Sequence, residues 1–62
     1  MTSNSETLKR LIRIWAIIED TSPKTVMYQL MRDLKIKSLN DEDAQKLAVT
    51  YLRHKLNTKG DD

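Results

Sequence analysis

The sequence predicts an all-α fold, a compact three-helix bundle with helices at about 5–18, 23–34 and 41–56. Apolar residues recur three and four positions apart in each of these segments, which is the spacing of one helix face. Each segment also follows residues that commonly cap a helix N-terminus. No stretch longer than 35–37 shows the strict alternation of a half-buried strand. The short connections favour neighbouring helices that pack against one another.

The first helix is preceded by a capping signal and followed by a polar break. Ser3 and Glu6 have the S-x-x-E spacing of a capping box, and Ser5 is an equally suitable N-cap. The polar segment 19–23 ends the helix after Ile18. Its predicted core positions are Leu8, Leu11, Ile12, Trp15 and Ile18.

The second helix begins where a serine meets the only proline. Ser22 is the predicted N-cap and Pro23 the first helical residue, a position that needs no N–H donor. The predicted core positions are Val26, Met27, Leu30, Met31 and Leu34.

The third helix has the clearest apolar pattern. Asn40 is its predicted N-cap, followed by three acidic residues in the positive first turn, and Leu39 can pack onto that turn. Cations at 53–55 suit the C-terminal end. The predicted core positions are Ala44, Leu47, Ala48, Tyr51, Leu52 and Leu56.

The 62 residues predict a single small helical domain with frayed tails at 1–4 and 57–62. A core of this size is only marginally sufficient, and the absence of cysteine excludes disulfides and thiolate metal sites. We therefore expect no metal and no cofactor. Association with another protein or with a second copy, as a homodimer, is the remaining route to extra stability.

The segment 8–18 carries more apolar surface than one small core requires. Eight of its eleven residues are apolar, and the others are Lys9, Arg10 and Arg13. A core-facing helix needs an apolar stripe somewhat over ~100° wide, whereas these residues cover roughly twice that arc. Ile14 falls at the margin of the stripe and Ile17 outside it. The predicted partner-binding residues are Arg10, Arg13, Ile14 and Ile17.

A second face, for another partner or for nucleic acid, combines cations with an aromatic ring and a methionine. Its members are Lys9, Lys24, Tyr28, Met31 and Lys35. The simpler interpretation is that these are solvated helix-face charges and that an exposed apolar residue is ordinary.

Catalysis has little support in the sequence, so we predict no catalytic residues and no small-molecule substrate. The carboxylate pairs at 19–20 and 41–43 lie beside helix starts, where they are stabilised as solvated anions. His54 is matched to no nucleophile motif, and no glycine-rich loop is present.

The helix count and lengths resemble those of tri-helical, helix-turn-helix-like DNA-binding domains. However, the third helix would present carboxylates at 41–43 to the phosphates. A surface-seeking amphipathic helix is another interpretation of 8–18, but the other two helices need this helix to cover their apolar faces. No apolar run approaches the ~20 residues of a membrane span, and the N-terminus lacks the basic start of a signal peptide, so we expect a cytoplasmic protein.

We therefore predict a small non-enzymatic protein–protein interaction or regulatory module that presents its first helix to a partner or to its own copy. The alternative is a small DNA-binding regulator that contacts phosphates through its basic faces. The net charge of +2 favours neither.

Overall fold

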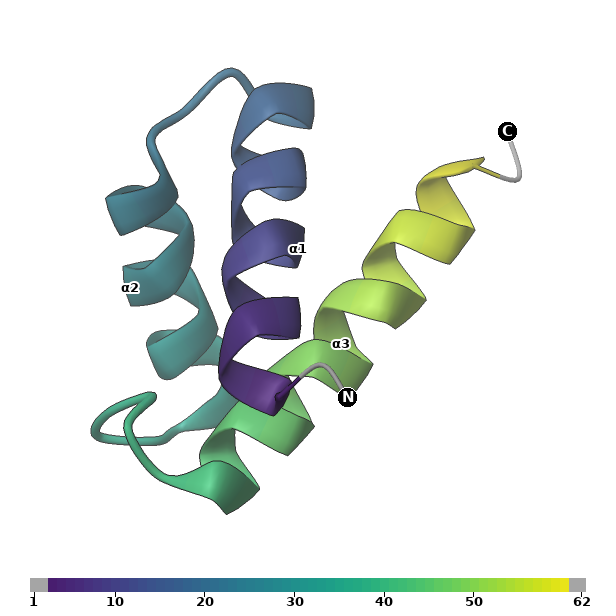
Figure 1. The fold of residues 1–62 in the computed structure, drawn as a ribbon. Helices are drawn as coiled ribbons and strands as arrows, with labels where there is room; N and C mark the ends of the chain where they lie inside the picture. The colour runs from purple at the N-terminus through teal and green to yellow at the C-terminus, as the bar shows by residue number, and fades with distance from the viewer. Residues whose placement is uncertain (1–2, 61–62) are drawn as a thin grey trace.

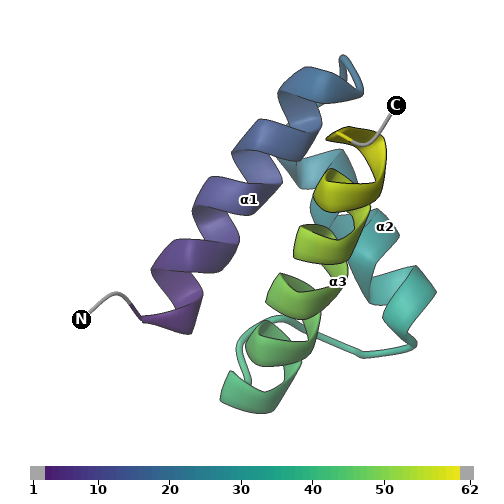
Figure 2. The ribbon, with the colours of Figure 1, turned by 90° about the vertical axis from the view of Figure 1, so that its right-hand side faces the viewer.

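The computed structural model describes residues 3–60 and confirms the three-helix bundle. Helix α1 spans Asn4–Ile18, α2 spans Pro23–Leu34 and α3 spans Glu42–Gly60. Helices α1 and α2 run antiparallel, and α3 begins below them and rises past α1 (Figure 1). Turned by 90°, the view shows α3 crossing in front of α2 (Figure 2). Helix α3 packs chiefly against α1 and touches α2 much less.

Serine side chains cap the first two helices as the sequence predicts. The Oγ atoms of Ser3 and Ser22 each accept a hydrogen bond at 3.2 Å, from the N–H groups of Glu6 and Thr25 respectively. Of the two candidate caps for α1, the structure selects Ser3. The predicted N-cap of α3 is wrong by one residue, because the carbonyl of Asp41, rather than that of Asn40, accepts the first helical bond from Gln45 at 2.9 Å.

Two helices end in left-handed turns made without glycine. Asp20 has φ 53°, and Lys35, the C-cap of α2, has φ 57°. The following residues close these ends, since the N–H of Thr21 bonds the Ala16 carbonyl at 2.9 Å and the N–H of Ile36 bonds the Met31 carbonyl at 3.0 Å. The chain has a single glycine, at position 60, so other residues must adopt this conformation.

Helix α3 extends past its predicted end at residue 56 to Gly60. Nothing in 57–59 breaks a helix, and the Thr58 hydroxyl bonds the His54 carbonyl at 2.9 Å. Residues 57–60 of the predicted tail are therefore helical. Residues 1–2 and 61–62 lie outside the described part of the chain.

The core lies where the three helices meet, and most of its buried members were predicted. Ala48 and Leu52 of α3 are fully buried, and Val26 of α2 is 1% exposed. Ala16 and Val49 are buried although they were not predicted as core. The full buried set is Leu8, Ile12, Trp15, Ala16, Val26, Leu30, Leu39, Ala48, Val49 and Leu52.

Three predicted core residues are exposed, and the tilt of α3 accounts for one of them. Because α3 packs mainly on α1, its buried stripe shifts to include Val49, and Leu47 on the other side is left exposed. Ile18, the last residue of α1, is 42% exposed, and the last turns of α3 diverge from α1 in Figure 1. Met27, the third, lies at the rim of a groove between α1 and α2.

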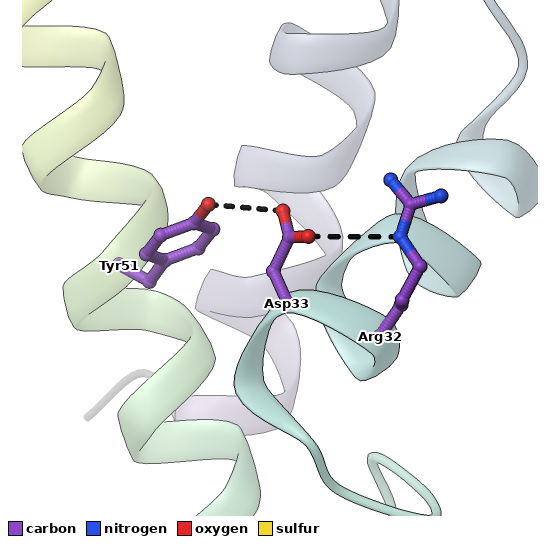
Figure 3. A network of polar contacts seen from close by, with 3 residues as sticks. All are labelled: Arg32, Asp33 and Tyr51. Carbon is purple, nitrogen blue, oxygen red and sulfur yellow. Dashed lines mark hydrogen bonds and ion pairs between the residues drawn. The ribbon is translucent and has the colours of Figure 1, made fainter.

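Polar contacts join α3 to its neighbours at the edge of this core. The Tyr51 hydroxyl donates to Asp33 Oδ2 of α2 at 3.0 Å, and Arg32 Nε lies 3.7 Å from Asp33 Oδ1 (Figure 3). Lys55 Nζ lies 5.1 Å from the centroid of the Trp15 ring and 5.0 Å from that of Tyr51. These cation–π contacts close one side of the tryptophan.

Candidate partner-binding face

The outward face of α1 carries three exposed isoleucines that form one continuous patch. Ile17 is 80% exposed, Ile14 46% and Ile18 42%. Residues three and four positions apart are neighbours on a helix surface. Ile17 and Ile18 follow Ile14 by three and four positions, so both are neighbours of Ile14 on α1. We call these three residues the isoleucine patch.

Ile18 joins the isoleucine patch because of the tertiary structure. Its position at the end of α1 suits a core residue, but α3 diverges there and the chain turns away into α2. The N–H of Asp20 bonds the Ile17 carbonyl at 3.2 Å, so the backbone of Asp20, an exposed residue, follows the patch directly.

Two arginines precede the isoleucine patch on the same face. Arg13 lies one turn before Ile17, and Arg10 one turn before Ile14, and both arginines are exposed. Within residues 3–58, neither guanidinium forms an ion pair with a carboxylate. Their charges are therefore directed to solvent beside the apolar surface.

A shallow groove of about 490 Å³ between α1 and α3 begins at this face. Arg10 and Ile14 line it from α1, and Arg53 lines it from α3. Arg53 was read in the sequence only as a cation favoured at a helix end. Arg53 lies four residues after Val49, on the same side of α3. If Val49 had been predicted as a core residue, the sequence would also have placed Arg53 on the side that faces α1. The complete lining is Asn4, Thr7, Arg10, Leu11, Ile14, Val49 and Arg53.

The structure therefore places the four predicted partner-binding residues on one face and divides them between two surroundings. Arg10 and Ile14 line the groove, whereas Arg13 and Ile17 are exposed outside it. The arrangement offers an apolar surface with a basic margin.

The residues of the second predicted face come from both α1 and α2. Lys24, Tyr28 and Met31 follow one another four and three residues apart along one side of α2. Lys9 and Met31 line a groove of about 450 Å³ between α1, α2 and the segment before α3, with Leu39 at its base. Tyr28 lines a different hollow of α2, with Gln29 and Arg32. Lys24 and Lys35, at opposite ends of α2, line neither hollow.

Two further observations concern the described residues. Within 3–60, none of the helices combines the length and apolar character needed to cross a membrane. Across the same residues, His, Asp and Glu side chains nowhere gather in a group of three able to hold a metal ion. A comparison with protein-family models, curated proteins and solved structures gave no significant match.

Proposed function

We propose that this chain is a small non-enzymatic interaction module that binds another protein chain through the isoleucine patch and its arginines. The observation that carries the proposal is the exposure of Ile17, 80% accessible with two half-exposed isoleucines beside it. A single exposed apolar residue is ordinary, but a contiguous apolar group with a polar rim is typical of an interaction site.

The composition of the face also suits a protein partner. Arginine is enriched at protein interfaces whereas lysine is depleted, and both cations beside the patch are arginines. Each isoleucine that becomes fully buried contributes at most about 1.5–3 kcal/mol, reduced here because two of the three are already half covered. Such a face binds through a few central apolar contacts, with the arginines steering the approach of an acidic partner.

Photo-cross-linking tests the proposal directly. A photoreactive amino acid at position 17 should yield one dominant covalent protein adduct in the source cells, because this position is central to the face. The matched control carries the same group at Thr50, which is exposed on α3. Equal, diffuse labelling from both positions would overturn the proposal.

Nucleic acid is the second candidate partner, supported by Arg10 and Arg53, which come from different helices to one groove. Phosphate contacts strengthen as salt falls, so DNA binding should appear first at low ionic strength. Titration of a fluorescent duplex at about 20 mM salt tests this candidate. Absence of binding there eliminates it, whereas binding that is weakened by Arg53→Gln supports it.

A further inference from the structure

Charge is distributed unequally along the outward face of α1. Arg10 and Arg13 precede the isoleucine patch, and Asp20 follows it at the turn into α2. Ile18, the last residue of α1, lies eight residues after Arg10, a rise of about 12 Å at 1.5 Å per residue, and Asp20 follows in the turn beyond the helix end. Glu6, also exposed, lies one turn before Arg10, so the N-terminal part of this face carries two arginines and one carboxylate, the centre is apolar, and the end at Asp20 is acidic.

We propose that the occupant of this face is a second copy of the chain, docked with its α1 antiparallel across a two-fold axis. This inference rests on the proposed function and names its partner. With the axis near Trp15 and Ala16, Ile14 lies level with the partner's Ile17, and the reverse contact follows by symmetry. The two isoleucine patches then cover each other.

Charge complementarity selects this orientation. In the antiparallel arrangement, Arg10 lies beside the partner's Asp20, and symmetry produces the same pair twice. A parallel arrangement would instead place Arg10 and Arg13 against the same cations of the partner, which is unfavourable. An acidic foreign protein is not required, because the complementary carboxylate is already at the far end of the patch.

The dimer formed in this way is weak. Stable interfaces bury about 800 Å² per partner, and a face centred on three isoleucines of one helix is smaller. We expect a dissociation constant on the order of tens of micromolar, which places the exchange between monomer and dimer within reach of measurement. The core is small and has no disulfide to support it. Dimer formation would therefore also stabilise the folded chain.

Sedimentation equilibrium from about 5 µM to about 1 mM tests the inference, a range that spans the expected dissociation constant. The wild-type chain should convert from monomer to dimer, and Ile17→Glu should remain monomeric with unchanged helicity. The control Thr50→Glu adds the same charge on α3 and should dimerise like the wild type. A wild-type chain that stays monomeric throughout the range overturns the second-copy inference.

Two substitutions test the orientation. Arg10→Gln and Asp20→Asn should each weaken the dimer about five-fold, since each removes both symmetry-related pairs. Asparagine is chosen because it also tolerates the left-handed turn at position 20. The double variant should be no weaker than either single one, because the two residues share one interaction. A dimer that is tightened by Arg10→Gln would instead be parallel, and additive losses would show that the two residues do not meet.

The cross-linking experiment separates this inference from the function on which it rests. An adduct at position 17 with twice the chain mass of 7.3 kDa supports the second copy. An adduct of another mass, together with a strictly monomeric wild-type chain, overturns the second-copy inference and keeps the proposed function.

Discussion

Both faces of α1 carry large apolar residues, but these residues have opposite surroundings. Trp15 is 5% exposed and lies at the centre of the molecule, whereas Ile17, two residues later, is 80% exposed. Both are large apolar residues on one regular helix. The difference shows that the angular position around the helix, and not the apolar character of the segment, decides which residues form the core. The outward isoleucines therefore contribute little to the fold, which leaves room for a role in binding.

Trp15→Ala should have the largest effect on the free energy of unfolding. Replacing a buried tryptophan costs about 3–5 kcal/mol, and the substitution also removes the ring beneath Lys55. A bundle this small has a total stability of comparable size, so the variant should be largely unfolded at 25 °C. Far-UV circular dichroism measures this directly. Retention of full helicity and a cooperative transition would show that the inner face is not what holds the bundle together.

Ile18→Ala should have an intermediate effect on the free energy of unfolding. This substitution tests whether Ile18 belongs to the buried face of α1 or to the exposed one. The side chain is 42% exposed, so we expect a loss of about 1 kcal/mol, below the 2–5 kcal/mol of a fully buried position. Urea denaturation at a few micromolar protein, roughly below the expected dissociation constant, isolates the monomer. A loss above about 2 kcal/mol would return Ile18 to the core, as the sequence pattern predicted.

Lys55→Gln tests the polar edge of the inner face and should cost about 0.5–1 kcal/mol. The substitution keeps a long side chain but removes the charge that lies over the rings of Trp15 and Tyr51. Lys46→Gln, at an exposed position of α3, is the matched control and should be neutral. Equal urea midpoints for the two variants would exclude a stabilising cation–π contact.

Ile17→Ser should have the smallest effect on stability, below about 0.5 kcal/mol, because the side chain is already in solvent and the helix propensities of the two residues are similar. The same variant should lose association with the partner. Thermal unfolding at low concentration and sedimentation at high concentration measure the two properties separately. A destabilised monomer would mean that the outward face supports the fold.

The elements of the bundle were predictable because their signals are local. A capping serine contacts the N–H three residues later, so the sequence predicted Ser22 as the start of α2 and narrowed the start of α1 to Ser3 or Ser5. The end of α3 was predicted too early, because a cluster of cations favours a helix end without requiring one. The exposure of Ile17 also followed from helical periodicity.

The candidate site was predictable only in part, because its shape depends on how the helices cross. Periodicity assigns a residue to a side of its own helix but does not indicate how far a neighbouring helix extends over that side. Ile18, predicted as core, is exposed at the end of α1 and widens the isoleucine patch. The crossing of α3 with α1 buried Val49, exposed Leu47 and brought Arg53 beside Arg10.

The sequence by itself therefore determined the number of helices, their starts to within about two residues, and the surplus of apolar surface on α1, since these depend on contacts within about one helical turn. Only the tertiary structure decided which apolar residues remain uncovered and which cations share a groove with them. Those outcomes depend on the packing of helices distant in the chain, and the tilt of α3 against α1 is set by the whole core at once.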